Sequence, residues 1–298
     1  MSARAPIDET VLAALSIALP RVAGVTVLRN EPIDRVLTLR TGGPADLLVH
    51  VETPEALSGA TELLKRVRCP WRVCWPFSTM VAREGGVRGA VLTLGAGFDQ
   101  LQTGPDGSVI LGAITPFSAL SAAGPAFSTL ASWSGTPGAL FACGESHRLA
   151  GTCAGVTVVS GDSVRRRTVA ATAAPPNLAR TTSLVSVQLR PVPPAASAPL
   201  LPGQLLAPDT AMLNAGGTTH HIAITLSEPD LCESRLRGWT LSQAWPGLVV
   251  QSGEGTAADL ELLARALSEK LLREHVMVTK PAIRVFGRTP QNPSPRKR

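Results

Sequence analysis

Residues 70–89 read PWRVCWPFSTMVAREGGVRG, a segment that predicts a strand, a loop and a second strand. The loop stands where a phosphate-cradling glycine cluster would be expected. Such a loop needs backbone N–H donors, positive φ angles and no side chains in the way, and glycine meets all three needs. Here Trp75 and Phe77 are bulky, and Pro76 has no N–H to donate. The sequence therefore predicts the scaffold of a nucleotide site without its phosphate-binding chemistry.

The residues around this loop predict a small α/β subdomain. Val36–Val51 alternates around a glycine turn and indicates two short strands. Pro54–Arg66 has helical spacing of its leucines, with Thr53 as the N-cap and Pro54 in the first helical position. Trp71–Cys74 and Ala90–Leu94 predict strands on either side of the loop. The order of these elements is typical of a β-α-β unit.

The remainder of the chain predicts further short strands and one long helix. A helix is expected at Thr256–His275, because its leucines recur at helical spacing, and a strand at Ile283–Phe286 closes that last domain. Before them, short β runs are predicted at Val109–Gly112, Val156–Val159, Val164–Val169 and Leu184–Leu189.

These elements divide the chain into six expected segments. They are an N-terminal helix or extension (1–20), a first subdomain (21–95), a second subdomain (96–190), a proline-rich linker (191–208), a C-terminal domain (209–288) and a disordered basic tail (289–298).

Composition and charge narrow the functional class. The chain is 44% apolar and 17% charged, as expected for a folded soluble protein, and no apolar run approaches the ~18 residues of a membrane span. Val11–Leu19 is preceded by Asp8 and Glu9 rather than by basic residues, so it predicts an amphipathic helix and not a signal peptide. We therefore expect a cytoplasmic protein.

The cysteines and the basic residues do not form a motif that identifies a ligand. Five cysteines without CxxC or Cys/His ligand spacing predict buried free thiols and no metal site. The net charge of +6 suits an anionic ligand such as a nucleotide-sugar. Nucleic acid is not expected, because tyrosine is absent, other aromatics are few, and the basic residues are dispersed.

Several motifs resemble the MurB family, the UDP-N-acetylenolpyruvoylglucosamine reductases of peptidoglycan (cell wall) synthesis. LRTGGPADLLV (39–49), PW-x-V and REGGVRGAVLTLG (83–95) resemble its flavin domain, and SGTPG (134–138) is similar to its second flavin loop. TLSQAWPGLVVQSGEGTAADLELL (240–263) and PAIRVFG (281–287) resemble its substrate domain. The resemblance implies an α+β protein with a PCMH/VAO-type FAD-binding fold. Its two FAD-type subdomains would be 21–95 and 96–190, and a MurB-type C-terminal α+β domain of the substrate-binding type would follow at 209–288.

The resemblance also implies a two-step hydride relay. In the family, NADPH reduces FAD, and the flavin passes hydride to the enolpyruvyl group of a UDP-sugar. A serine donates a proton while an arginine and a glutamate stabilise the intermediate. The serine position falls on Thr210, the arginine on Arg180 and the glutamate on Ala282, which cannot ionise.

The cofactor loops are altered in the same way. The family's GGGSN loop falls on residues 75–79, where only Ser78 is retained. A substrate-binding segment is altered too: the Lys-His pair of the family's KHANF segment, which would help to hold the substrate, falls on Ala244 and Trp245. If FAD is bound, the resemblance assigns its contacts to Gly42, Gly43, Ser78, Thr79, Gly85, Gly86, Gly135 and Gly138.

Two functions follow as hypotheses. In the first, the chain is a MurB homologue that has lost FAD and catalysis, and it binds a UDP-sugar or a cell-wall synthesis protein. In the second, it is an active FAD- and NADPH-dependent UDP-N-acetylmuramate dehydrogenase, with Glu145 or Glu254 as a relocated glutamate or one of His220 and His221 as a replacement acid. Another flavin oxidoreductase of the same superfamily is disfavoured, because it too needs a glycine-lined pyrophosphate loop.

Overall fold

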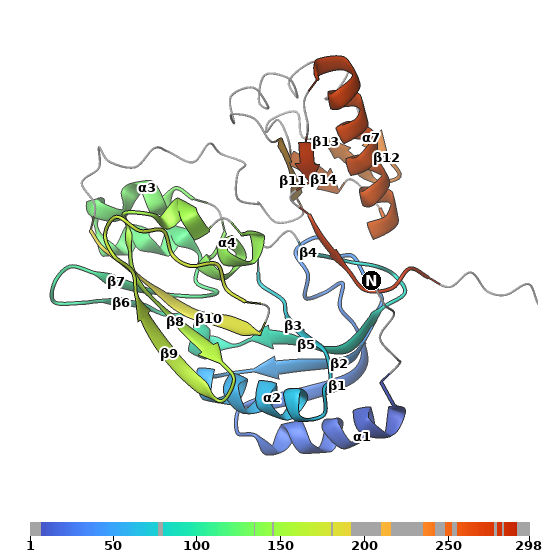
Figure 1. Cartoon of the computed structure of the whole chain (residues 1–298), viewed down its shortest axis with the longest axis horizontal. Helices are drawn as coiled ribbons and strands as arrows, with labels where there is room; N and C mark the ends of the chain where they lie inside the picture. The colour runs from blue at the N-terminus through green and yellow to red at the C-terminus, as the bar shows by residue number, and fades with distance from the viewer. Residues whose placement is uncertain are drawn as a thin grey trace, which may run out of the picture.

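The computed structural model describes residues 7–76, 80–133, 135–144, 146–179, 181–191, 210–215, 235–241, 248–251, 255–276, 279–281 and 283–290. In these residues the strands form two large sheets near the N-terminus, a third sheet in the C-terminal part and a two-stranded ribbon that joins them (Figure 1). Short 3-10 helices connect the larger elements: η1 (Leu19–Arg21), η2 (Ala96–Phe98), η3 (Phe117–Ala123), η4 (Pro125–Phe127) and η5 (Ser146–Leu149).

The first sheet has the strand order β1-β2-β5-β3. Its strands are β1 (Val25–Pro32), β2 (Pro44–Val51), β3 (Trp71–Val73) and β5 (Val87–Leu94), and α1 (Glu9–Ala18) and α2 (Pro54–Arg66) pack beside them. β5 pairs in parallel with both β2 and β3, whereas β1 and β2 are antiparallel. Helix α2 confirms the predicted start, because the Thr53 hydroxyl accepts the Ala56 N–H at 3.2 Å and Pro54 is the first helical residue.

One strand prediction in this sheet is wrong. Val36–Val51 contains one strand, β2, and the partner of β2 is β1, which the sequence pattern did not indicate. The preceding residues turn instead: the N–H groups of Val36 and Leu37 both donate to the Ile33 carbonyl. Leu37 is buried although it lies in this turn, so an apolar residue at this position does not indicate a strand.

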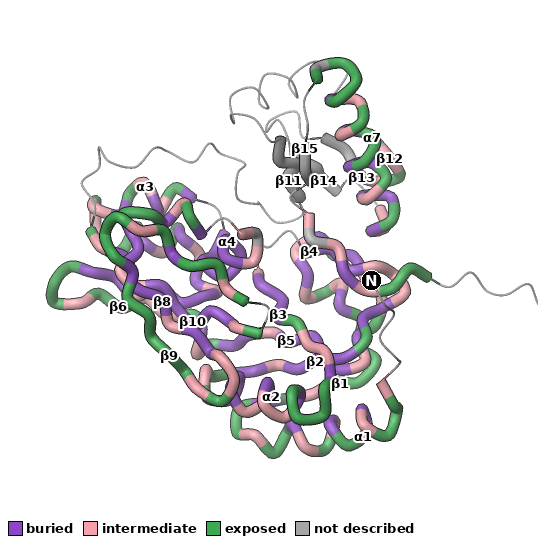
Figure 2. Tube along the Cα trace, viewed as in Figure 1, coloured by how far each residue is buried: buried purple, intermediate pink, exposed green. Residues whose placement is uncertain are grey.

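The second sheet has the order β6-β7-β10-β8-β9 and is antiparallel throughout. Its strands are β6 (Leu101–Thr103), β7 (Val109–Gly112), β8 (Cys153–Ser160), β9 (Ser163–Thr168) and β10 (Thr182–Leu189), with the short helices α3 (Ser128–Ala131) and α4 (Pro137–Cys143). All four strands predicted here are confirmed. Figure 2 shows β8 and β10 largely buried and the edge strand β9 exposed.

The C-terminal part contains a third sheet and the longest helix. The sheet has the order β12-β13-β14-β11-β15, and α7 (Ala257–His275) begins with a capping box of Thr256 and Asp259. The predicted strand at 283–286 is present as β16 (Arg284–Phe286), but it pairs in parallel with β4 (Met80–Ala82) and not with the third sheet. The strands of that sheet are β11 (Thr210–Ala215), β12 (Arg235–Leu236), β13 (Trp239–Leu241), β14 (Leu248–Gln251) and β15 (Thr279–Pro281).

Two hydrophobic clusters hold these parts together. The larger one runs continuously through the first and second sheets and includes residues of both. The smaller one packs Leu39 and Val81 against the fully buried Trp239 and the inner face of α7. None of the described helices has the length and apolarity needed to cross a bilayer. The predicted N-terminal helix is confirmed: Leu12 and Leu15 are buried and Glu9 and Thr10 are exposed, although the apolar Ile17 is exposed as well.

Candidate functional site

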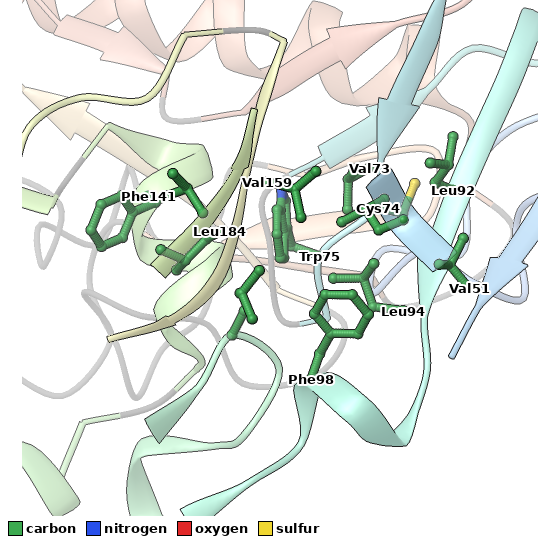
Figure 3. Close-up of a cluster of buried hydrophobic side chains, with 14 of the residues drawn as sticks. Val51, Val73, Cys74, Trp75, Leu92, Leu94, Phe98, Phe141, Val159 and Leu184 are labelled. Carbon is green, nitrogen blue, oxygen red and sulfur yellow. The ribbon is translucent and has the colours of Figure 1, made fainter. Parts of the chain in front are cut away.

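The side chain of Trp75 lies between the first and second sheets. The chain leaves β3 at Val73 and enters the WPFST loop, and Trp75 is only 8% exposed. Figure 3 shows its indole between the Val73–Cys74 side of the first sheet and three apolar residues of the second subdomain, Val159, Leu184 and Phe141. Trp75 is therefore part of the core that joins the two subdomains.

The indole packs directly on Gly138, a residue of the SGTPG loop. A β-carbon built on Gly138 would lie 2.6 Å from Cζ3 of Trp75 and 2.8 Å from the carbonyl oxygen of Ala113, so no larger residue fits without rearrangement. The same two loops are joined by a hydrogen bond, because the buried Thr136 hydroxyl donates to the Pro76 carbonyl at 3.3 Å. The two loops that the resemblance assigns to a flavin thus contact each other.

The N–H groups at the start of α4 are already used. Gly138 donates to the Ala113 carbonyl at 2.8 Å, and Ala139 donates to the Thr136 hydroxyl at 3.2 Å. Pro137 has no N–H, and Leu140 donates to the Thr136 carbonyl at 3.1 Å. A helix N-terminus binds a phosphate through N–H groups that have no acceptor within the protein. The N–H groups at the start of α4 already donate to protein oxygens, so they are not available to a phosphate.

The two glycine pairs of the first subdomain lie together, and their amides are also engaged. Gly43 and Gly86 both donate to the Arg83 carbonyl, at 3.2 and 3.1 Å, and Gly85 donates to the Arg288 carbonyl at 2.9 Å. A β-carbon on Gly43 would lie 2.9 Å from the Gly86 nitrogen, and one on Gly85 would lie 2.6 Å from the Thr289 carbonyl oxygen. These glycines therefore permit close approach between segments of this chain.

Of the remaining predicted site residues, some lie elsewhere in the fold and the others lie outside the described part of the chain. Thr210 is the first residue of β11 and pairs with Val250 of β14. Gly135 has a φ of +97° and its carbonyl accepts the Phe117 N–H, and Gly42 has a φ of +118°. The other predicted residues lie outside the described part of the chain: Ser78, Thr79, Arg180, Ala282, Ala244, Trp245 and the proposed replacements Glu145, Glu254, His220 and His221.

A cavity of about 400 Å³ opens beside Trp75, and the sequence did not indicate it. Its walls come from β3, β4, α4, β10 and β16, which are far apart in the sequence. Among the described residues it is lined by Trp71, Arg72, Val73, Trp75, Met80, Phe141, Ala142, Leu178, Ala179, Thr182, Ser183 and Val285.

Two acidic side chains attach the C-terminal helix next to the glycine pair Gly85–Gly86. Arg83 donates through Nε and Nη2 to the two carboxylate oxygens of Glu261, at 2.8 Å each. The hydrogen bond to Glu261 raises the pKa of the Arg83 guanidinium. Glu84 accepts the N–H of Ala257, the first residue of α7. A carboxylate at a helix N-terminus is favourable, so Glu84 stabilises this attachment.

Comparison with known proteins shows which proteins this chain is similar to. The chain is 36% identical over 80 residues to the UDP-N-acetylenolpyruvoylglucosamine reductase of Bacillus velezensis, and 37% identical over 76 residues to that of Bacillus subtilis. The matched segments span about a quarter of this chain and of each relative: 27% and 26% for the first, 26% and 25% for the second. No family model matches the sequence.

A solved structure extends the similarity to nearly the whole chain. The crystal structure of UDP-N-acetylenolpyruvylglucosamine reductase (MurB) from Thermus caldophilus superposes on it with a TM-score of 0.62 at 20% identity, over 88% of this chain and 98% of that one. This chain therefore has the fold of MurB, and about a quarter of it is similar in sequence to these reductases. The superposition confirms the expected fold class, an α+β protein of the MurB type.

The residues that the structure describes at these two loops do not fit the pyrophosphate of a flavin dinucleotide. The indole of Trp75 fills the space against Gly138, and Pro76 supplies no donor. The amides of Gly43, Gly85, Gly86 and Gly138 donate to backbone carbonyls of the protein itself. Binding a pyrophosphate there would require breaking these bonds and moving a buried aromatic ring.

The described part of the chain shows no group of side chains suited to a metal. The residues that the structure describes contain no set of three or more His, Cys, Asp or Glu side chains placed to hold an ion. Cys69, Cys74 and Cys153 are buried free thiols, as predicted for them. Burial raises the pKa of Cys74 to about 12 and the pKa values of Cys69 and Cys153 to about 11, so these thiols stay protonated at neutral pH.

Proposed function

We propose that this MurB relative does not hold FAD and acts as a binding or scaffold protein in peptidoglycan synthesis. The observation that carries the proposal is the indole of Trp75 packed on Gly138, between the two loops that the family resemblance assigns to the flavin. A buried ring and a dinucleotide cannot share that space.

The packing also explains how the fold would be stable without a cofactor. An unfilled apolar void costs about 24 cal/mol for each Å³, and the Trp75 side chain occupies space that would otherwise remain between the sheets. The two subdomains then share one continuous hydrophobic core. A protein that needed the flavin to complete this core would instead lack a large side chain here.

The reaction depends on the flavin more than on any single side chain. Removing one preorganised catalytic donor costs about 10²–10³ in rate, whereas hydride transfer needs the cofactor itself. Two side-chain changes also favour a loss of catalysis: Ala282 stands at the position of the family glutamate, and Thr210 stands at the position of the serine. We propose that what remains is recognition of a UDP-sugar or of a cell-wall synthesis protein, in the cytoplasm.

The second candidate function is an active FAD- and NADPH-dependent UDP-N-acetylmuramate dehydrogenase. One observation favours it: the cavity of about 400 Å³ opens beside Trp75 of the first loop and beside α4, the helix that begins in the second loop, so space for a ring is present. In that function Arg180 and Thr210 would be the catalytic residues, and Ser78, Thr79 and the glycines of the motifs would hold the cofactor.

A flavin assay separates the two functions. The purified protein is denatured and the supernatant is examined for released flavin, and the native protein is titrated with FAD and followed by calorimetry and thermal melting. We expect a colourless protein with no heat of FAD binding and no NADPH oxidation in the presence of the enolpyruvyl UDP-sugar. The Bacillus subtilis reductase, treated identically, is the positive control. A yellow protein with one flavin per chain would refute the proposal.

A further inference from the structure

We propose that the edge strand β9 binds an acidic, extended peptide segment of a partner protein as an additional strand of the second sheet. β9 lies at one end of that sheet, where β8 is its neighbour on the inner side. Figure 2 shows this strand exposed to solvent. The inference goes beyond the proposed function and does not depend on it, because β9 contributes no residue to the cavity beside Trp75.

The outer backbone groups of β9 are open to pairing. The Val169 N–H donates to the Ala154 carbonyl of β8 at 2.8 Å, and the register of the two strands is continuous. Since the backbone groups of a paired strand point alternately to its two sides, those of Val164, Arg166 and Thr168 point away from β8. In the described chain no other segment forms a backbone hydrogen bond with these outward groups. A partner strand can therefore add to this side.

Three consecutive arginines, Arg165, Arg166 and Arg167, determine the charge of the partner. All three are exposed, and none lies within ion-pair distance of an acidic side chain that the structure describes. Arg165 donates through Nε to the Ser163 hydroxyl at 2.9 Å, and Arg166 donates through Nη2 to the side-chain oxygen of Gln188. Both acceptors are neutral, and each bond uses one of the five N–H donors of its guanidinium. The remaining donors form their strongest bonds with carboxylates.

The alternation of side chains along β9 favours an extended peptide over other anions. Arg165 and Arg167 project to one face of the sheet, and Arg166 projects to the other. A flat anionic surface that lies on one face of the sheet meets only the arginines of that face. An added strand has side chains on both faces, so acidic residues at three consecutive positions can each lie opposite an arginine.

The same arginines disfavour a second copy of this chain at this edge. Two β9 strands paired with each other would bring arginine opposite arginine, and like charges in that arrangement are destabilising. Positive charge on an edge strand protects a sheet from such self-association. The opposite edge strand, β6, is only three residues long and carries no charge. Length and charge therefore make β9 the edge of this sheet that suits an acidic partner.

The test uses the labelled peptide acetyl-TVEEEVT-amide, whose glutamates can lie opposite the arginines. Its binding to the full-length protein is followed by fluorescence polarisation, and we expect binding that weakens as salt is added. The neutral peptide acetyl-TVQQQVT-amide should bind about tenfold more weakly. The peptide acetyl-TPEEEPT-amide keeps the charge but has prolines that cannot pair in a strand, so it should also bind about tenfold more weakly.

Two pairs of variants separate backbone pairing from charge. Val164→Pro removes one outward N–H and leaves the bonds to β8 in place, so the acidic peptide should bind about tenfold more weakly, whereas Val164→Ala should bind it nearly as the native protein does. The double variant Arg165→Gln/Arg167→Gln should weaken the acidic peptide about fivefold. Arg66→Gln/Arg265→Gln, at exposed arginines outside β9, is the charge-matched control.

The outcomes are distinguishable. If the acidic peptide does not bind the native protein, the inference is overturned while the proposed function is unaffected. If the proline-containing peptide binds equally well, or if Val164→Pro and Val164→Ala behave alike, strand addition is wrong. If a short oligonucleotide or a phosphatidylglycerol vesicle binds at β9 and the peptide does not, the partner class is wrong. A bound flavin would refute the proposed function and leave this inference standing. Circular dichroism of each variant shows that a loss of binding is not a loss of folding.

Discussion

Replacing Trp75 by alanine should strongly destabilise the protein. The side chain is 8% exposed and no hydrogen bond of its indole to another described residue is found, so the loss is one of apolar packing. An aromatic side chain buries about 150–250 Å², and at about 25 cal/mol per Å² this is worth roughly 4–6 kcal/mol. Measured Trp→Ala losses in cores are about 3–5 kcal/mol. We therefore expect a loss of about 4 kcal/mol, a large fraction of a typical total of about 5–15 kcal/mol.

Equilibrium unfolding in urea measures this loss. The midpoint should fall while the slope stays constant, because the surface exposed on unfolding is nearly unchanged. Trp71→Ala is the matched control: Trp71 lines the cavity but is only partly buried, so its loss should be clearly smaller. The reasoning is refuted if Trp75→Ala lies within about 1 kcal/mol of the wild type, or if the two variants are equally unstable.

Three further predictions concern other contacts. Gly138→Ala should cost about 1–3 kcal/mol by overpacking against the indole, and part of this cost should vanish in a Trp75→Ala background, as measured by a double-mutant unfolding cycle. The pKa of Asp259 is lowered because the Thr256 hydroxyl donates a hydrogen bond to its carboxylate. This carboxylate therefore contributes to stability above about pH 4, and the contribution is lost as the pH falls below that value. The Asp259→Asn variant should show a flatter decline in melting temperature on the acid side. Cys69, Cys74 and Cys153 should react with iodoacetamide at pH 8 only after denaturation, as read by peptide mass spectrometry; labelling of the native protein would contradict their burial.

The sequence predicted best the elements that carry a local signal. Helix α2 has a Thr53 cap and a first-turn proline, and α7 has its capping box, so both starts are readable from a few residues. Strand β1 was missed because most of its residues are exposed or half-buried and its apolar residues do not alternate clearly. The turn before β2 was taken for a strand because burial there comes from packing on other segments.

The site was predictable in part. The residue types of the WPFST loop indicated that bulk stands where a phosphate loop needs space, and the structure places Trp75 in the core. The contact between Trp75 and Gly138 was not predictable from the sequence. The two residues lie in different subdomains, and the sequence around each gives no indication of the other. The Arg83–Glu261 pair joins residues 178 positions apart for the same reason. The cavity depends on five separate elements and has no sequence pattern of its own.

The glycines retained from the family motifs are explained by this fold without a cofactor. Gly43 and Gly85 must stay small because Gly86 and Thr289 approach them, and Gly42 has a φ of +118° that other residues rarely adopt. Retention of these glycines therefore does not indicate a bound flavin. Gly138 gives the sharpest case, because a β-carbon there would meet both the Trp75 ring and the Ala113 carbonyl oxygen. The second loop can therefore keep its position between this ring and this carbonyl only with glycine at 138.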